Sequence, residues 1–399
     1  MIMGIPLFLL FCVYGVVNAY LPILLFLLGY SPTLIGILQG IFDAAGLIFP
    51  IFISSRVDAK GNYGITMILC GAIMAVMPPL LIYVRNFWIS AFALAVFAIG
   101  FKGAVPVSDA LISRMLGTSN TNYGKIRVTG SIGFVFITLF LQITQLINTT
   151  SAASIALWLI LPAFLFSLSV IVIPRIRSPM PQQKTDGFLL RDDTVERAQK
   201  KNSSTMPLIS SLYELPAVFW AGILLIFLGF LGMTPSQRFF SLYVQEYLHL
   251  NSYAGLWALS AAAEVPFMFI SGRFIRRFGT VRILAFSLLA VMMRNLIYAI
   301  FPTFTGAVAG QLFHSVCFGL FHPAAIVFVT ESVPKRLTTV GMTLYTSVAV
   351  GFASVIGNVI GGIIIDTLGY RLLFVVFAGF PLIGILFFLI LRDRLYRLN

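Results

Sequence analysis

Charged residues are scarce in this sequence. They make up 10% of its 399 residues, whereas a water-soluble domain carries about a quarter. Hydrophobic residues make up 59%, and the mean hydropathy is +0.99. The composition therefore excludes a water-soluble globular protein. The chain is long enough for many membrane spans, since each needs about 20 residues.

Cysteine and histidine are also few, with three of each. Cys12, Cys70 and Cys317 fall inside apolar runs, so no disulfide framework is predicted. The sequence has no Cys/His metal spacing, glycine-rich phosphate loop or nucleophile elbow. We therefore expect a protein that is not an enzyme and holds no metal or organic cofactor. Without a nucleotide-binding segment, any transport must be driven by an ion gradient or by the solute's own gradient.

What the chain has in abundance is long apolar runs. We predict that each is a helix, because lipid offers no partner for free backbone N–H and C=O groups. Stretches such as "ILLIFLGFLG" do not alternate as the strands of a membrane barrel do. The start "MIMGIPLFLLF" lacks the basic residues of a signal peptide and is interpreted as part of the first span. The predicted all-α membrane protein has twelve spans, at about 4–28, 31–54, 63–84, 88–113, 123–147, 153–174, 216–246, 251–272, 281–301, 304–330, 339–365 and 370–391.

The formal net charge of +13 at first suggests nucleic-acid binding, but the positions of the cations do not. With both termini inside, most of the 26 lysines and arginines lie in or beside cytoplasmic loops, which is the positive-inside pattern. We therefore predict a multi-pass protein of the cell inner (plasma) membrane with both termini cytoplasmic. We expect the lipid bilayer and a small-molecule substrate as its partners, no nucleic acid, and a monomeric state.

One long polar stretch divides the chain. Residues 175–211 are predicted to be a cytoplasmic linker between an N-terminal six-helix bundle, 1–174, and a C-terminal six-helix bundle, 212–399. The loops after the second span of each half, "SSRVDAKG" and "GRFIRRFG", match faintly. Parallel halves with weak internal repetition are typical of secondary transporters.

These two loops resemble the Gly-x-x-x-Asp-Arg-x-Gly signature of the major facilitator superfamily. The first copy lacks the leading glycine and the arginine, and the second has Arg276 in place of the aspartate. Together with the twelve spans and the 6+6 division, the resemblance implies the major facilitator fold, two pseudo-symmetric six-helix bundles. It gives Asp58 and Arg277 gating or structural roles.

Ionisable residues inside spans are costly and normally face a cavity or a partner. Counting 1.5 Å per residue, Asp109 and Arg127 lie at similar depth in adjacent antiparallel helices and are predicted to pair. Asp43 and Lys102 also lie at similar depth, and we interpret them as gating or structural charges. The full set comprises Asp43, Lys102, Asp109, Arg127, Arg238, Glu264, Arg294, His314 and His322.

The run "NYGKIRVTGSIGF", with Asp109 before it, is similar to the fourth and fifth helices of lactose permease and the phenylpropionate permeases. That resemblance implies that Asp109 and Arg127 contact substrate, that Ser131 borders the site, and that Phe134 stacks on a ring of the solute. The alternatives are a purely structural pair that fixes the helical hairpin and an ordinary packing role for Phe134.

In the second half, Arg294 and His314 have the spacing of an arginine and a histidine of that family, and Glu264 resembles its helix-eight glutamate. The resemblance implies a proton-coupling role for these three residues. Cys317 stands where lactose permease has its proton-carrying carboxylate, so lactose itself is not the expected solute.

The expected function is proton-coupled uptake of a small polar or aromatic-polar solute by alternating access. The candidates are a glycoside, a nucleoside and an aromatic carboxylate. A proton-coupled efflux antiporter is one alternative, although "GSIGFVFITLF" lacks the Gly-Pro-x-x-Gly-Gly run usual in drug-efflux members. The other alternative is a non-transporting receptor or lipid-handling protein on the same fold.

Overall fold

The computed structural model describes residues 3–116, 123–172 and 212–395 and, within these ranges, all side chains except those of residues 49–56, 58–60, 116, 123–125 and 392–395. The predicted linker, 175–211, lies outside the described residues. The described chain ends on either side of it at Val172 and Leu212, and the end of the molecule where these two residues lie is called the linker end below.

The first half is a bundle of six helices with short connections. Local sequence sets the helix ends: Ser31 caps the second helix through its hydroxyl, Pro32 opens it, and Gly61 closes it with a left-handed φ of 69°. The helices are α1 (Gly4–Leu27), α2 (Pro32–Lys60), α3 (Tyr63–Tyr83), α4 (Phe87–Leu116), α5 (Tyr123–Thr144) and α6 (Ala152–Val172).

The second half is helical too, but less regular. Three of its apolar segments contain π-helical or broken stretches, which frequently mark functional positions in long helices. The elements are α10 (Ala217–Thr234), η2 (Pro235–Phe239), α11 (Phe240–Leu242), η3 (Tyr243–Tyr247), α12 (Tyr253–Phe278), α13 (Thr280–Ile300), α14 (Phe304–Cys317), α15 (Phe321–Ser332), η4 (Lys335–Leu337), α16 (Thr338–Leu344), η5 (Tyr345–Phe352) and α17 (Ala353–Leu395).

The described residues form ten segments long and apolar enough to cross a membrane, and Pro32–Ile48 is a shorter apolar helix. The segment Lys335–Leu391 is counted once, yet α17 changes direction at Gly369, whose φ of 80° is not helical. It therefore accounts for two of the predicted runs. The all-helical membrane fold expected from the sequence is confirmed.

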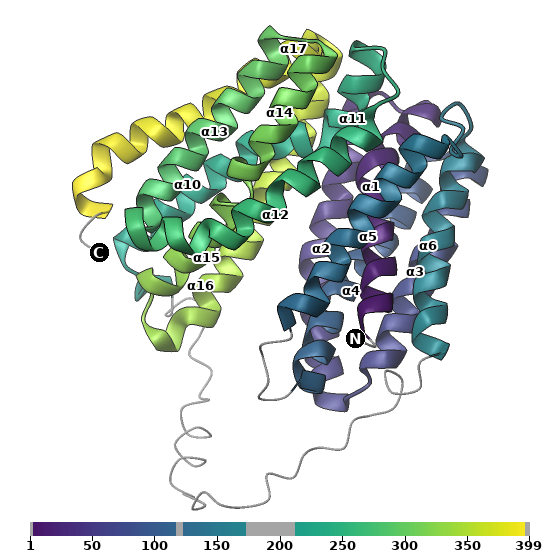
Figure 1. The fold of residues 1–399 in the computed structure, drawn as a ribbon, viewed down its shortest axis with the longest axis horizontal. Helices are drawn as coiled ribbons and strands as arrows, with labels where there is room; N and C mark the ends of the chain where they lie inside the picture. Colours follow the sequence, from purple (N-terminus) through teal and green to yellow (C-terminus); the bar gives the residue numbers. More distant parts are fainter. Residues whose placement is uncertain (1–2, 117–122, 173–211, 396–399) are drawn as a thin grey trace, which may run out of the picture.

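Two bundles lie side by side and contact each other at the end away from the linker (Figure 1), called the closed end below. There α2 packs against α17, and α5 packs against α12. Gly36 and Gly362 permit the first contact, because a Cβ at Gly36 meets the carbonyl oxygen of Asn358 and a Cβ at Gly362 meets that of Pro32. Small residues at a helix interface let two backbones approach closely in this way.

Polar contacts reinforce the closed end. The Thr33 backbone N–H, in the first turn of α2, donates to Asp366 Oδ2 at 2.8 Å. Gln142 on α5 donates from Nε2 to the Asn251 carbonyl at 3.1 Å, and its Oε1 accepts from the Gly255 N–H at 3.0 Å. Each bond joins one half of the chain to the other, so the closed end is tied by both backbone and side-chain groups.

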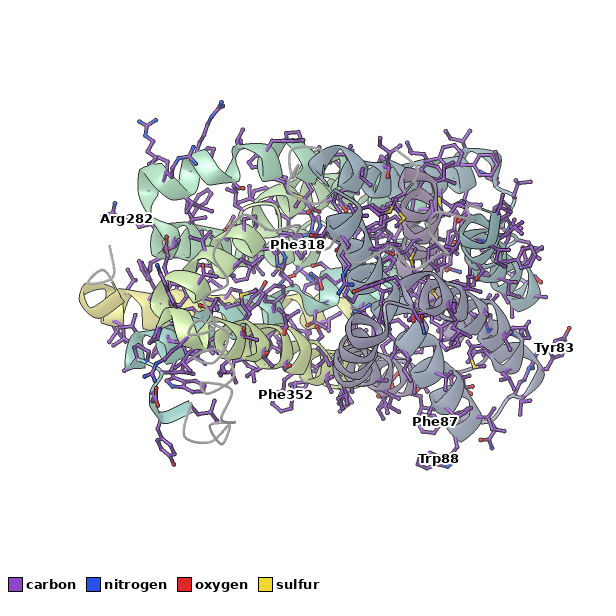
Figure 2. The ribbon with its side chains drawn as sticks, turned by 90° about the horizontal axis from the view of Figure 1, so that it is seen from below. Tyr83, Phe87, Trp88, Arg282, Phe318 and Phe352 are labelled. Carbon is purple, nitrogen blue, oxygen red and sulfur yellow. The ribbon has the colours of Figure 1, made fainter. Side chains whose placement is uncertain are left out.

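The outer surface is apolar, as lipid contact requires. Trp88, Ile143 and Phe269 are each more than 70% exposed. Seen from the linker end, Tyr83, Phe87 and Trp88 lie at the periphery, whereas Phe318 lies near the middle of the molecule (Figure 2). The polar groups described next lie between or within the bundles.

Candidate functional site

Asp43 is at the centre of a cluster that joins the two halves. Its carboxylate is almost fully buried on α2. Arg238 Nη2, on η2, donates to Asp43 Oδ1 at 2.6 Å, and Asn358 Nδ2, on α17, donates to Asp43 Oδ2 at 2.9 Å. Lys102 Nζ, on α4, lies 3.5 Å from Oδ1. The structure thus brings Asp43 and Lys102 together as the sequence predicts, and it adds two partners from the other half.

A proline follows Lys102 by one turn in α4, which is continuous from Phe87 to Leu116. Pro106 lies within this helix and has no N–H to donate to the Lys102 carbonyl one turn earlier. On the other side of Lys102, the Phe101 carbonyl accepts from the Tyr14 hydroxyl at 2.9 Å, and the two rings stack with centroids 3.8 Å apart. The lysine side chain is one-third exposed. Aromatic packing therefore fixes one side of this position, while part of the lysine side chain stays exposed.

Asp109 and Arg127 approach each other as predicted. Arg127 Nε lies 3.8 Å from Asp109 Oδ1. The Arg127 side chain is 35% exposed and the Asp109 side chain 30%. The guanidinium also lies over the ring of Phe11, 4.5 Å from its centroid, which is a cation–π contact. This Nε–Oδ1 distance is longer than a hydrogen bond, and both side chains are partly exposed although Oδ1 itself is buried, so a solute can compete for the arginine.

Ser131 and Phe134 follow Arg127 at positions i+4 and i+7 of α5, so the three residues share one helix face. Both side chains are half-buried, and Phe134 packs against the core. The glycines between them serve a different contact, since a Cβ at Gly133 or Gly130 meets α1 at Phe8 or Phe11. Gly130 precedes Phe134 by one turn and Arg127 lies over Phe11, so the face predicted for substrate borders the one that packs on α1.

Arg294 is the largest fully buried side chain in the described structure. It lies on α13, and its three donors have neutral partners: Nε donates to the Tyr298 hydroxyl at 3.2 Å, Nη2 to Gln311 Oε1 at 2.7 Å, and Nη1 lies 3.1 Å from His314 Nδ1. Since a guanidinium has only donors, Nδ1 must be the acceptor. His314 therefore carries its ring proton on Nε2.

That Nε2 atom lies 3.4 Å from Glu264 Oε2 on α12. The structure thus brings together all three residues predicted for proton coupling. Glu264 and Arg294 do not form a direct pair, because the imidazole of His314 lies between the carboxylate and the guanidinium. The physical reason is depth: α13 and α14 face each other at Arg294 and His314, and Glu264 reaches them from the neighbouring α12.

The helix that carries His314 is interrupted just after it. Residues 318–320 separate α14 from α15, and Gly319 allows close approach to α12, where a Cβ meets Phe267. Phe318 stacks between His314 and His322, with centroid distances of 5.6 Å and 5.2 Å. The Nδ1 atom of His322 lies 2.6 Å from the Tyr345 hydroxyl on η5.

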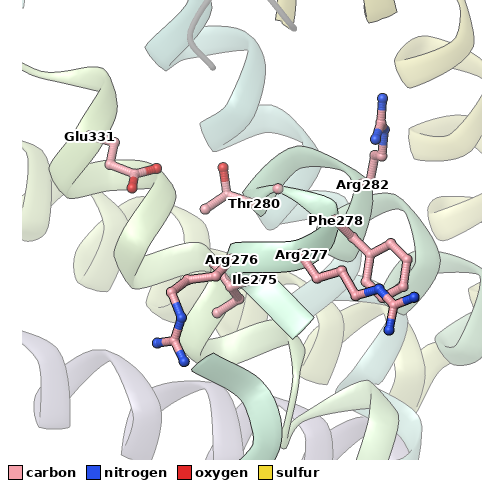
Figure 3. A pocket seen from close by; sticks show the side chains of 8 residues that line it. Ile275, Arg276, Arg277, Phe278, Thr280, Arg282 and Glu331 are labelled. Atoms are coloured by element: carbon pink, nitrogen blue, oxygen red, sulfur yellow. The ribbon is translucent and has the colours of Figure 1, made fainter. Parts of the chain in front are cut away.

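The loop charges lie apart from this centre. The side chain of Asp58 lies outside the described part of the chain. Arg277 lies at the linker end of α12, 5.4 Å from the Phe278 ring centroid. Together with Arg276, Thr280 and Glu331 it borders an open depression of about 600 Å³ (Figure 3).

Sequence reasoning placed Arg238 inside a span without finding its partner, and it missed Asn358, Gln311 and Tyr298. Each of these three residues carries an amide or hydroxyl group within an apolar run, and this feature could have identified them. Such groups form hydrogen bonds between helices in a membrane. The three buried cysteines are free thiols, as predicted.

A family model described as "MFS_1 like family" matches residues 1–376. This chain belongs to that family. It is accordingly a multi-pass membrane transporter of the major facilitator type rather than an enzyme, which confirms the resemblance noted from its sequence motifs. The remaining question is what it carries and in which direction.

Relatives with assigned names are transporters. The chain is 26% identical over 296 residues to an "Uncharacterized transporter" of Bacillus subtilis (73% of this chain, 66% of the relative) and 26% identical over 291 residues to a "Maltose permease" of Geobacillus stearothermophilus (73% and 68%). These two alignments span about two thirds of each relative. A "Probable 3-phenylpropionic acid transporter" of Escherichia coli is 22% identical over 379 residues (91% and 90%). The fold matches a crystal structure of a point mutant of the nucleoside transporter NupG with a TM-score of 0.79, at 16% identity and 97% and 98% coverage.

Proposed function

We propose that this MFS_1 like transporter is a proton-coupled symporter that imports a small polar or aromatic-polar organic solute across the cell inner membrane. In this proposal both termini are cytoplasmic and the protein works as a monomer in the bilayer. The proton is the coupling ion, and no other cofactor takes part. Asp109, Arg127, Ser131 and Phe134 contact the solute, and Glu264, His314 and Arg294 handle the proton.

The observation that carries the proposal is the chain of contacts from Arg294 through His314 to Glu264. A carboxylate in this position accepts from the His314 Nε2–H and lies near a buried cation. Protonation of Glu264 removes the charge that this N–H is directed at and weakens the link between α12 and α14. A proton that binds Glu264 therefore changes the contact between two helices of the second half.

The same helix reaches the contact between the halves. Gly255, which donates to Gln142 at the closed end, lies nine residues before Glu264 on α12. Nine residues correspond to about 13 Å along a helix. A change in the position of α12 thus reaches the interface that must open when the bundles rock, which supports coupling of proton binding to alternating access.

With cytoplasmic termini, the closed end faces outward and the linker end faces inward, so the arrangement corresponds to a state closed on the outside. The charges of Asp109 and Arg127 are then reached from the cytoplasmic side. Outward opening requires the α2–α17 and α5–α12 contacts to separate.

The test uses purified protein in proteoliposomes with an imposed pH gradient, acid outside. Maltose, uridine and 3-phenylpropionate represent the three candidate solute classes. We expect at least one to accumulate only when the gradient is present, and to exchange with internal solute when it is absent. Accumulation under the reversed gradient would identify an antiporter instead. Binding without any flux would contradict transport through this site and favour a receptor.

A further inference from the structure

The charges within the described spans do not balance. Among the nine ionisable residues predicted inside spans, four cationic side chains stand against three carboxylates: Lys102, Arg127, Arg238 and Arg294 against Asp43, Asp109 and Glu264. His314 does not change this count, because its Nδ1 accepts from Arg294 and the ring is then neutral, and His322, whose Nδ1 lies 2.6 Å from the Tyr345 hydroxyl, is left out of it. One positive charge is therefore in excess in a region where unpaired charge is expensive.

The excess charge is located at Asp43. Arg238 Nη2 holds Asp43 Oδ1 at hydrogen-bond distance, 2.6 Å, and Lys102 Nζ faces the same oxygen at 3.5 Å. The other carboxylate oxygen is taken by Asn358. One carboxylate therefore serves two cations, and the lysine is the weaker bound and the more exposed of the two, 33% against 15%.

Buried hydrogen-bonding groups without partners among the described residues occur on residues of this cluster and one turn from it, two of them donors and one, Asn358 Oδ1, an acceptor. The Arg238 Nε–H is buried and no described group accepts it. Gln39, only 3% exposed, lies one turn before Asp43 on α2, and its Nε2 likewise has no partner in the described structure. Donors left without acceptors in a buried site cost free energy, and an acceptor-rich ligand relieves that cost.

We infer that the transported solute is a monoanionic organic acid, and that Lys102, with Arg238 and Asp43, receives its carboxylate. This inference rests on the proposed transport function and selects among its solute classes. Lys102 and Asp109 are seven residues apart on α4, which places them on one face with about 10 Å between them. An acid whose carboxylate meets Lys102 extends towards the depth of the Asp109–Arg127 pair, and the half-buried Phe134, seven residues beyond Arg127 on the antiparallel α5, lies near the depth of Lys102.

An anion at Lys102 also explains why both halves contribute to the site. Lys102 belongs to the first half and Arg238 to the second, so a carboxylate between them compensates the charge of the cluster as a whole. The positive charges of the cluster are then balanced when the solute is bound. Excluding water from the cluster during the conformational change therefore costs less free energy with the solute than without it. The empty carrier retains the uncompensated cation.

The test measures dissociation constants by calorimetry or thermal shift with three matched pairs: 3-phenylpropionate and its amide, glucuronate and glucose, orotidine and uridine. We expect one acid to bind at least tenfold more tightly than its neutral partner. Lys102→Met should abolish that preference, and Lys102→Arg should keep it. Lys335→Met, which removes the same type of side chain from the exposed η4, is the matched control and should also keep it.

Equal binding of acid and neutral partner, an acid preference that survives Lys102→Met, or no binding of any acid at millimolar concentration would each overturn the inference. Proton-driven accumulation of a neutral solute would overturn it and leave the symporter proposal intact. An acid that binds through Lys102 but shows no flux in proteoliposomes would instead overturn the symporter proposal and leave the binding site.

Discussion

At the residue scale, the Asp109–Arg127 pair and the group formed by Arg294, His314 and Glu264 differ in how their charges are held. The Asp109–Arg127 pair is partly solvated and 3.8 Å apart, so it is easily reorganised by a ligand. Arg294 is buried and held by three neutral groups, so its position is fixed. Glu264 lies between these extremes, with 17% of its side chain exposed and one imidazole partner. A fixed cation beside an accessible carboxylate suits a site where a proton enters and leaves.

Asp109→Asn should weaken solute binding at least tenfold and leave thermal unfolding almost unchanged. The amide keeps the size of the side chain but removes the charge that orients Arg127, and the exposed pair contributes little to stability. The measurement is a binding isotherm for the solute found in the flux assay, beside a melting curve. Glu331→Gln, an exposed carboxyl at the linker end, is the control. Wild-type affinity in the Asn variant would reduce the pair to a structural role.

Glu264→Gln should retain exchange and counterflow but lose accumulation driven by a pH gradient. The glutamine resembles the protonated acid, so the carrier can still rock but no longer responds to proton binding. Parallel assays of counterflow and of uptake under an acid-outside gradient separate the two activities. If the variant still concentrates solute, the coupling residue is not Glu264, and His314 and His322 become the next positions to change.

At the element scale, α2 and α17 form the contact that must break when the closed end opens. Gly36 and Gly362 bring the two backbones together, and Asp43 lies two turns beyond Gly36 on the same helix. On α12, Pro266 interrupts the hydrogen bonds of a long helix beside Glu264. The helices that carry the polar centres are therefore also those that join the halves or are locally irregular.

Gly36→Ala should shift the protein away from the closed-end contact, because the new methyl group meets the Asn358 carbonyl. A cysteine placed at Gln39 reports this shift through its rate of reaction with a membrane-impermeant maleimide. We expect labelling to increase severalfold against a low background, since the three native cysteines are buried. Gly379→Ala is the matched control, since a Cβ there meets nothing within 4 Å. Equal labelling of both variants would contradict a closing role for Gly36.

At the scale of the whole molecule, the two halves are separate bundles that share polar contacts at one end. Their buried hydrophobic residues form one cluster that extends over both halves, and the cluster at Asp43 joins positions 195 residues apart in the chain. Rotation of one bundle against the other must therefore rearrange apolar as well as polar contacts between the halves. In the proposed alternating access these contacts exchange.

Separate expression of residues 1–180 and 205–399 should restore part of the transport activity when both are present. The composition of the predicted linker is polar and lacks a hydrophobic period, so we expect it to act as a tether. The assay is uptake by membranes that contain both fragments, with each fragment alone as the control. Complete loss with both fragments stably inserted would contradict a passive tether.

The sequence by itself determined the helical membrane fold, because a run of apolar residues in lipid has only one way to satisfy its backbone. It also identified nearly all the ionisable groups of the two centres, since each is conspicuous in an apolar run. Depth counting found the Asp109–Arg127 pair because the two residues are only 18 positions apart in the chain, on consecutive spans. Only the tertiary structure decided that Arg238 binds Asp43 and that His314 separates Arg294 from Glu264. Depth along a helix gives the height of a side chain but not the direction it faces, and contacts between distant helices depend on how the bundles rotate and pack.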